Sequence, residues 1–486
     1  MAASGTVLAV LAVLALPVIA LAHTMLKSSD PADGARLTTV PRAIRLSFTE
    51  SPALAFTRVE LRNSNGRAVV TEAVRYAPDS KRSVVIGVRG PLDVGEYVVV
   101  WQTAGDDGHP TRGRFRFTIL SGASGAGPMP SGEAGAAVTA PGQSHPPSAH
   151  HVIAPMPESG SFGAESLVYA AIRWLQFTTL VVIIATVAFR FVVLGFMGRE
   201  RGPRTALIDS AAQGAARIGV VAAMGLVVAT LLRLAAQSVA MHGASDAWHL
   251  SFVGTMLRDT VWGWAWLLQL LGVIVVVVGF ARARRPSTGA AAWSLAALGA
   301  AVLAFTPALS GHAVSAPRLM ILAVLADGVH VIGASGWLGS LVLVVMAGIP
   351  AALRLPAGER GEAVADLVNA FSPTALTFAG MTATTGVFAA WLHLGTVSAL
   401  WESTYGKTLL VKLAVLSIVA ATGAYNWLRV RPALGNVEGV RRVRRSASVE
   451  LAVGLIVLAI TAVLVATPTA VDMSAMRASV THASDR

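Results

Sequence analysis

Residues 97–118 read Tyr97-Val-Val-Val-Trp101-Gln-Thr-Ala-Gly-Asp106-Asp107-Gly-His109-Pro-Thr-Arg-Gly-Arg114-Phe-Arg-Phe117-Thr. The segments 97–101 and 114–118 have a period of two residues, which predicts two β-strands. Asp107 and His109 then lie in the loop that joins them. Because they are two residues apart on a strand or tight turn, both side chains can point the same way and share one metal ion.

Further segments of the same kind surround this pair and predict a complete β domain over residues 23–121. Turn signals separate the segments, as in Ser64-Asn65-Gly66 and Asp93-Val94-Gly95. Short strands at this spacing predict an all-β Greek-key or cupredoxin-like sandwich. The other predicted strands lie at residues 44–48, 58–61 and 84–88.

An apolar leader precedes the β domain. Its apolar core runs from Val7 to Ala20, and an A-x-A site ends at Ala22, so residues 1–22 are predicted to be a signal peptide. The leader has no Lys or Arg before this core, which leaves an uncleaved anchor helix as the alternative. Cleavage would make His23 the N-terminus, with a free α-amine that titrates near ~7.7–8.

The amine and imidazole of His23, with Asp107 and His109, would form a tetragonal set of three nitrogens and one oxygen. This set suits Cu(II). The chain contains no cysteine, which excludes disulfides and thiolate metal sites and leaves His, Met, Asp and Glu as the strong ligands.

Composition predicts a membrane protein for most of the remaining chain. Of the 486 residues, 54% are hydrophobic and only 13% are charged, too few for three soluble domains. From residue 164 to 470 we expect an all-α transmembrane bundle of about eight helices, and a tail at 471–486. The expected spans are 166–194, 206–240, 256–281, 290–309, 317–348, 367–397, 407–430 and 447–468.

Charge in the loops predicts the orientation of this bundle. Arginines concentrate after the first, third, fifth and seventh spans, which places those loops in the cytoplasm. The β domain and the C-terminus are then periplasmic, in a bacterial inner membrane. The net charge of +12 is therefore explained by topology, and we expect no nucleic-acid partner. The arginines are Arg190, Arg199, Arg201, Arg204, Arg282, Arg284, Arg285, Arg354, Arg360, Arg429, Arg431, Arg441, Arg442, Arg444 and Arg445.

Residues 122–163 are rich in Gly, Pro, Ser and His without periodicity, which is typical of a flexible linker. Its His and Met side chains have two interpretations: a tethered group that hands copper onward, or incidental residues in a solvated tract. They are Met129, His145, His150, His151 and Met156.

Polar side chains within or beside the spans mark a candidate path, because such groups are costly in lipid and usually serve a function. Five fall in the predicted outer half: His242, His312, Asp327, His330 and His393. We expect them to converge into a copper path, to which Met241 and Met320 could add soft donors for Cu(I). The alternative for a histidine at a helix end is an ordinary interfacial residue.

A second polar set, Lys412, Asn426 and Glu450, falls toward the middle or the cytoplasmic half of the last two spans. It is predicted to form a buried polar network. Such a network is either the inner part of a path or a Lys–Glu pair that ties two helices together.

The β domain resembles the periplasmic copper-binding proteins of the CopC family over essentially its whole length. This resemblance implies that His23, Asp107 and His109 bind Cu(II), with Glu50 either supporting the ligands or structural. Met25 is present without the Met-rich loop of the members that also bind Cu(I), so we expect Cu(II) alone. The segments that carry it are His23-Thr-Met-Leu-Lys-Ser-Ser-Asp-Pro-Ala-Asp-Gly34, Ile44-Arg-Leu-Ser-Phe-Thr-Glu50, Trp101 and Asp107-Gly-His109-Pro-Thr-Arg-Gly113-Arg-Phe-Arg-Phe117.

Residues 165–470 resemble the membrane copper-resistance proteins of the CopD type, with moderately specific motifs. The segments that carry this resemblance are Ser310-Gly-His312-Ala, Val329-His330-Val-Ile-Gly-Ala-Ser-Gly-Trp337-Leu-Gly339, Phe371-Ser-Pro-Thr-Ala375, Thr384-Thr-Gly386, Thr404-Tyr-Gly-Lys-Thr-Leu-Leu-Val-Lys412, Tyr425-Asn-Trp427 and Glu450. The resemblance implies copper uptake or homeostasis.

Together the two halves predict a copper homeostasis protein. The β domain would capture Cu(II), supplied by a periplasmic donor, and pass copper to the bundle for transport, for which we expect import. No nucleotide-binding motif is present, so ATP drive is not encoded. Sequestration or resistance without net transport, and haem-based electron transfer through paired histidines, are the alternatives. An oxidative copper enzyme fits poorly because Asp107 would block access to the metal, so no enzyme activity is expected.

Overall fold

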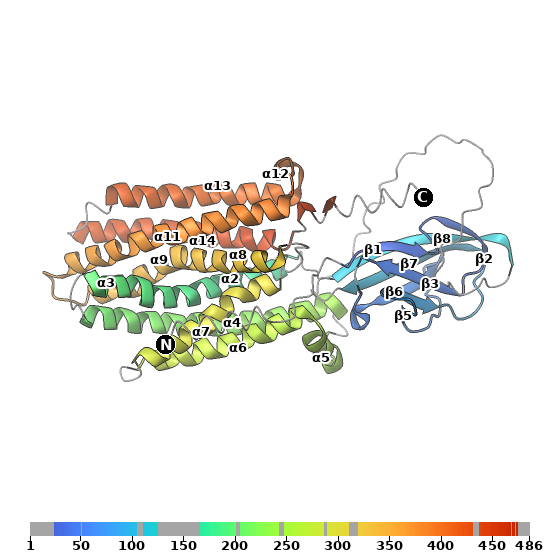
Figure 1. Cartoon of the computed structure of the whole chain (residues 1–486), viewed down its shortest axis with the longest axis horizontal. Helices are drawn as coiled ribbons and strands as arrows, with labels where there is room; N and C mark the ends of the chain where they lie inside the picture. Colours follow the sequence, from blue (N-terminus) through green and yellow to red (C-terminus); the bar gives the residue numbers. More distant parts are fainter. Residues whose placement is uncertain are drawn as a thin grey trace.

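The computed structural model describes residues 24–49, 51–104, 110–124, 166–200, 205–242, 247–285, 289–310, 319–430, 437–467, 469–471 and 473–474. An all-β domain comes first and a helical bundle follows, as the sequence predicted. Figure 1 shows the β domain beyond one end of the bundle.

The β domain is a sandwich of two four-stranded sheets, with strand orders β1-β3-β6-β5 and β2-β8-β7-β4. All pairings are antiparallel except that of β2 with β8. The strands are β1 (Leu26–Asp30), β2 (Ala35–Thr39), β3 (Ala43–Phe48), β4 (Arg58–Asn63), β5 (Arg75–Ala77), β6 (Ser80–Gly87), β7 (Gly95–Ala104) and β8 (Pro110–Ser124), with a 3-10 turn η1 (Leu54–Phe56).

The alternation at 97–101 and 114–118 is explained by this sandwich. Tyr97 pairs with Phe117 and Val99 with Phe115 across β7 and β8, and all four side chains are buried in the inter-sheet core. Val98 and Arg116 alternate with them on the outer face. One face of each strand is therefore apolar because it covers the other sheet.

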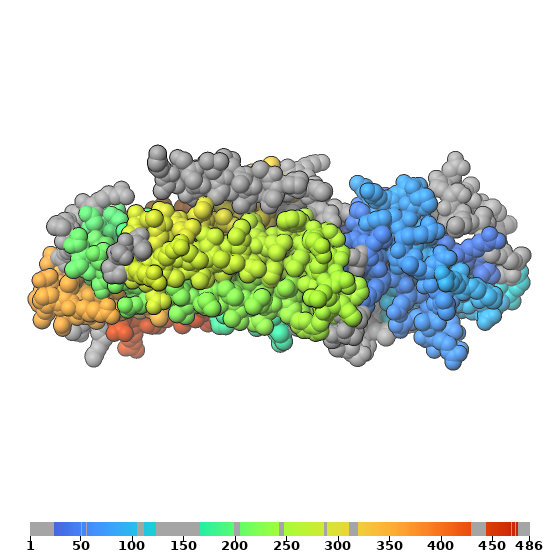
Figure 2. Space-filling model, turned by 90° about the horizontal axis from the view of Figure 1, so that it is seen from below, coloured from blue at the N-terminus to red at the C-terminus, as the bar shows by residue number. Residues whose placement is uncertain are grey.

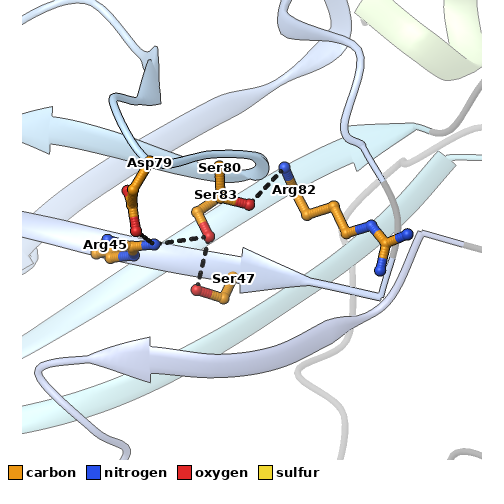
Figure 3. Close-up of polar contacts among 6 residues, drawn as sticks. All are labelled: Arg45, Ser47, Asp79, Ser80, Arg82 and Ser83. Atoms are coloured by element: carbon orange, nitrogen blue, oxygen red, sulfur yellow. Dashed lines mark hydrogen bonds and ion pairs between the residues drawn. The ribbon is translucent and has the colours of Figure 1, made fainter. Parts of the chain in front are cut away.

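The outer face of the other sheet is polar. Arg45 of β3 donates to Asp79 at 2.8 Å and to the Ser83 hydroxyl at 3.2 Å, and Ser83 lies 2.9 Å from Ser47 (Figure 3). The hydrogen bond from Arg45 holds the pKa of the Asp79 carboxyl below its usual range. Because the carboxyl is exposed, this ion pair contributes little stability.

Gly113 lies directly opposite Trp101 in the β7–β8 pairing, where a Cβ atom would overlap the buried indole ring. Gly113→Ala is therefore expected to destabilise the β domain by about 1–3 kcal/mol through overpacking. Hydrogen exchange of the β7 amides in the full chain should accelerate accordingly. The exposed Val70→Ala variant serves as the control, and unchanged exchange in Gly113→Ala would contradict the expectation.

Eight helices of the described chain are long and apolar enough to cross a membrane, in agreement with the number predicted. The first, fifth and seventh spans contain short π-helical turns. The helices and turns are α2 (Leu167–Ala188), η2 (Phe189–Val193), α3 (Leu194–Glu200), α4 (Thr205–His242), α5 (Leu250–Asp259), α6 (Val261–Ala283), α7 (Gly289–Leu309), α8 (Met320–Ala334), η3 (Ser335–Gly339), α9 (Ser340–Leu343), η4 (Val344–Gly348), α10 (Ile349–Ala352), α11 (Arg360–Leu394), α12 (Ala399–Glu402), α13 (Thr404–Tyr425), η5 (Asn426–Val430) and α14 (Val437–Leu464).

The third span begins later than the sequence suggested. It was expected from residue 256, but the helix breaks at Thr260, which has extended backbone, and α6 starts at Val261. The Thr260 hydroxyl accepts from the Gly263 amide at 2.9 Å and so caps α6. The preceding residues form the separate short helix α5.

The helices pack so that α2 contacts α4, α7, α14 and the η3 turn, while α8 lies against α11 and α13 against α14. Gly339 allows η3 and α2 to approach closely, because a Cβ atom added at this position would overlap Ala185. This packing leaves α8, α11, α13 and α14 around a common interior, described below.

The β domain rests on the outer ends of α4, α5 and α6. Phe56 and Ala104 form one apolar cluster with Met241, Met256, Trp262 and Trp266. Gln102 Nε2 donates to the Met241 carbonyl at 2.8 Å, and Arg112 Nη2 donates to the Ala240 carbonyl at 3.1 Å. Figure 2 shows the two parts in end-to-end contact.

Candidate metal centre and transmembrane cavity

Several predicted site residues lie outside the described residues. These are the candidate ligands His23, Asp107 and His109, the supporting Glu50, the membrane histidine His312, and the His and Met residues of the linker. The same holds for the signal peptide. The residues next to these segments in the chain are described, and their positions show where in the fold each segment begins.

The residues next to the candidate ligands come together at one end of the sandwich. Ala104 and Pro110, which flank the segment with Asp107 and His109, are paired across β7 and β8. Thr111 donates to the carbonyl of Thr24, the residue after His23, at 2.7 Å. The Thr24 side chain is buried. The sequence segments that carry the three candidate ligands therefore start from adjacent points.

The segment with Glu50 starts from the same place. Met25 and Thr49 exchange two hydrogen bonds: the Met25 amide donates to the Thr49 hydroxyl at 2.9 Å and the Thr49 amide donates to the Met25 carbonyl at 2.8 Å. The Ala53 amide donates to the Ala104 carbonyl at 3.0 Å. This end of the sandwich is the end that faces the bundle.

His242 lies in the contact between the two domains. It is 3% exposed, and its ring centroid is 5.5 Å from that of Phe56 in η1 and 5.0 Å from that of Phe252 in α5. Its Nδ1 is 3.2 Å from the Ser238 carbonyl. The expected convergence of His242 with Asp327, His330 and His393 is not seen, because α4 ends beneath the β domain while the other three line a cavity.

This cavity has a volume of about 1220 Å³ and lies among α2, α8, α11, α13 and α14. Its walls are mostly apolar, and its polar residues come from different spans. They include Asp327, His330, His393, Lys412, Asn426 and Glu450. A mostly apolar cavity with a few inward polar groups is typical of a binding site or a path through a membrane protein.

His330 lies within hydrogen-bond distance of a neighbouring threonine. Its Nδ1 is 3.0 Å from the Thr385 hydroxyl, and that hydroxyl donates its own proton to the Met381 carbonyl at 2.7 Å. The Thr385 hydroxyl can accept from Nδ1–H while it donates to Met381, and in that tautomer Nε2 carries the free lone pair. A Cβ atom added at Gly386 would lie 3.3 Å from the His330 ring. Thr385 therefore contacts the imidazole through its hydroxyl, and the lack of a side chain at Gly386 leaves space for the ring.

Asp327 and Lys412 face each other across the cavity. Each acts electrostatically on the other, and both line the wall. Asp327 lies ~10 Å along α8 from its outer end and Lys412 ~12 Å along α13, so the two are at similar depth. Lys412 therefore belongs to the outer half of the cavity, not to the middle or inner half as the sequence suggested.

Asn426 and Glu450 form a separate contact nearer the inner end. Asn426 Nδ2 donates to Glu450 Oε1 at 2.8 Å, and the Ser446 hydroxyl donates to Asn426 Oδ1 at 2.6 Å. This ties η5 to α14. The alternative of a Lys412–Glu450 pair is not observed: the carboxylate that acts on Lys412 is Asp327 of α8.

Among the described residues, no three His, Asp or Glu side chains are grouped closely enough to hold a metal ion together. His393, in the last turn of α11, stands edge-on to Tyr405 with centroids 5.9 Å apart. His330 is ~15 Å along α8 from the outer end. The described groups are thus distributed along the cavity at different depths.

Several residues that no sequence pattern singled out have prominent positions in the structure. Gln102 and Arg112 contact the bundle, and Arg173 and Arg233 line the outer part of the cavity. The sequence does contain a signal for the two buried arginines, because a charged residue inside an apolar span is costly and usually serves a function. No sequence signal distinguished the two contact residues from other strand-surface positions.

Fold and site together define a polytopic membrane protein that carries a β-sandwich domain on the outer end of its bundle. Three family models match the chain: the CopC domain at residues 26–120, the copper resistance protein D-like N-terminal domain at 164–317 and copper resistance protein D at 365–464. The chain belongs to these copper resistance families, with a CopC domain joined to a CopD membrane part.

The similar proteins cover either the whole chain or its first domain. Copper transport protein CutJ of Bacillus subtilis is 24% identical over 458 residues, which is 93% of this chain and 75% of that protein. Copper resistance protein C of Escherichia coli is 35% identical over 107 residues, 21% of this chain and 83% of that protein. The crystal structure of PcoC, a methionine-rich copper resistance protein from Escherichia coli, is 32% identical with a TM-score of 0.19 and covers 20% of this chain and 99% of that one.

Proposed function

We propose that the chain captures Cu(II) in the periplasm through its CopC domain and passes copper into the membrane cavity for import. Membership of the copper resistance families places it in copper homeostasis. CutJ, which is similar along 93% of the chain, is named as a copper transport protein. The main support for the proposal is that the β domain contacts the bundle at the end where the strands next to the candidate ligands finish.

Capture would use the α-amine and imidazole of His23 with Asp107 and His109. The convergence of Thr24, Thr111, Ala104 and Pro110 supports this set, because it brings the flanks of all three residues together. Glu50, whose neighbour Thr49 bonds Met25, would support the ligands. The amine requires removal of residues 1–22, so mass spectrometry of the mature protein should give His23 as its first residue.

Transfer would begin at the contact between the domains. Ala104, at the start of the segment with Asp107 and His109, packs with Met241 in the same cluster as Phe56. Met241 and His242 are soft and borderline donors at the outer end of α4. A β domain held at this contact by a tether delivers its metal at high effective concentration.

Within the membrane, His330 is the best-placed acceptor. The Thr385 hydroxyl can accept from its Nδ1–H, and in that tautomer the Nε2 lone pair is available to a metal ion. His393 lies nearer the outer end of the same cavity and Glu450 nearer the inner end. The polar side chains therefore extend along the cavity, which supports passage rather than a single storage site.

Loop charge supports the orientation in a bacterial inner membrane. Arg-rich helix ends, such as Arg282 at the end of α6, lie at the end of the bundle away from the β domain (Figure 1). By the positive-inside rule that end is cytoplasmic and the β domain periplasmic. A periplasmic copper carrier is the expected donor.

Cytoplasmic copper in cells that express the intact chain tests the proposal. We expect a rise over time that His23→Ala and His330→Ala both abolish at equal membrane abundance, because one removes the capture site and the other the acceptor. His249→Ala, an exposed histidine of the same bundle, is the matched control and should retain the rise.

No change or a fall in cytoplasmic copper would contradict import. Copper bound to the membrane fraction without a cytoplasmic rise would indicate sequestration. A Soret band in the purified chain would indicate haem at the membrane histidines instead.

A further inference from the structure

Two arginines lie inside the membrane-spanning part of the bundle, at similar depth. Arg173 of α2 is 7% exposed and lies ~9 Å along that helix from Leu167; Arg233 of α4 is 6% exposed and lies ~14 Å before its end at His242. A charge at such a position is costly unless an opposite charge or a ligand compensates it. The copper path proposed above does not use either residue.

Both guanidinium groups lie against aromatic rings. Arg173 Cζ lies 4.4 Å from the Tyr169 ring centroid, and Arg233 Cζ lies 5.4 Å from that of Trp262. The Tyr169 hydroxyl donates to Gln237 Oε1 at 2.7 Å. Aromatic faces attract a cation but supply neither a hydrogen-bond acceptor in the guanidinium plane nor a full negative charge.

The two positive charges also act on each other, which raises the cost of burying both of them. Within the described part of the chain, Arg233 has no hydrogen-bond or ion-pair partner, and its buried Nε is unsatisfied. The two carboxylates that line the cavity are engaged elsewhere: Asp327 acts on Lys412, and Glu450 accepts from Asn426. Arg233 therefore holds unused donors and an uncompensated charge.

There is room for a ligand at these groups. Arg173 and Arg233 line the outer part of the cavity beside Gln176 and Ser310. A guanidinium is a planar fork of donors that matches the oxygens of a phosphate or carboxylate in bidentate fashion. Two such forks carry two charges, which suits a phosphate group with three or more oxygens better than a single carboxylate.

We propose that Arg173 and Arg233 form a binding site for a phosphate group in the outer third of the membrane. The group would be either inorganic phosphate that enters from the periplasm or the headgroup phosphate of an anionic lipid. Its charge would lower the positive potential that a copper ion meets in the same cavity. That consequence rests on the proposed function, whereas the binding site does not.

Binding to the full chain, purified in uncharged maltoside detergent without copper, tests the site. Inorganic phosphate is titrated by calorimetry in one arm, and phosphatidylglycerol is counted by native mass spectrometry in the other. We expect one phosphate group per chain in at least one arm. Arg233→Gln should weaken that binding about ten- to hundredfold, the effect of losing hydrogen bonds to a charged group.

Arg217→Gln is the matched control, because it removes an exposed arginine from the same helix and should leave binding unchanged. Binding of inorganic phosphate alone identifies a free anion, and binding of phosphatidylglycerol alone identifies a lipid. If neither inorganic phosphate nor phosphatidylglycerol binds, for example because a carboxylate of this chain occupies the site, the proposal would be overturned. Equal binding by Arg233→Gln and the parent chain would overturn it as well.

Stability gives a second readout. Without phosphate, Arg233→Gln should unfold at the same temperature as the parent or higher, because it removes an uncompensated buried charge. With phosphate or lipid, only the parent should gain stability. If Arg233→Gln does not fold, Arg233→Lys is tested instead, because a lysine keeps the charge but lacks the planar set of donors of a guanidinium. Weaker phosphate binding by Arg233→Lys would support the site, and binding equal to that of the parent chain would overturn it.

Discussion

Lys412→Met is expected to destabilise the bundle by less than the ~3–5 kcal/mol that follows loss of one partner from a directly bonded buried ion pair, because Lys412 and Asp327 act on each other without an ion-pair contact. Asp327 would remain in the cavity wall with no opposing charge from α13. Thermal unfolding of the purified chain in detergent should show a markedly lower midpoint.

The double variant Asp327→Asn/Lys412→Met should recover most of the lost stability, because it removes both charges together. Lys407→Met, three residues into the same helix and exposed, is the matched control and should behave like the parent. Additive losses in the double variant would show that the two charges do not stabilise each other. Copper accumulation by a stable double variant would further show that the pair is structural and not a step of the path.

The local part of the fold could be predicted from the sequence. The alternation at 97–101 and 114–118 became β7 and β8 because a period of two is a property of neighbouring residues. The number of spans could be predicted because the length of an apolar run is also local. The break at Thr260 was missed because a single capping threonine is a weak signal within an apolar run.

The partners of the membrane polar groups could not be predicted. Position along a helix gives only an approximate depth, and it does not say which helix lies opposite. A Lys412–Glu450 pair between the last two spans was one of the two alternatives for this polar set. The structure instead places α13 so that Lys412 acts across the cavity on Asp327 of α8.

His242 illustrates the same limit at the domain contact. Its place at the end of a span was predicted, but its neighbour Phe56 belongs to a separate domain, and no periodicity relates the two. The ligand set His23, Asp107 and His109 stays a prediction, since those residues lie outside the described chain. What the structure adds is the convergence of their neighbours at the end of the sandwich that faces α4.

Phe56→Asp is expected to separate the two domains and to lower copper accumulation about tenfold or more when external copper is scarce. Phe56 is 2% exposed and lies in the cluster with Met241 and Trp262, so a carboxylate there would be buried without a partner. Its ring is outside the inter-sheet core of the β domain, so the domain should still fold and bind Cu(II). Lost docking would remove the high effective concentration of the captured metal.

Distance measurements between spin labels check docking apart from transport. Since the chain has no cysteine, labels at the exposed sites Val94→Cys and Leu250→Cys are unique. The parent should give a narrow distance distribution and Phe56→Asp a broad one. Val70→Asp places the same charge at an exposed site of the same domain and should preserve both the narrow distribution and the copper uptake. Uptake that survives in an undocked Phe56→Asp chain would show that copper enters the bundle without the β domain, and the capture step would then have to be separate from transport.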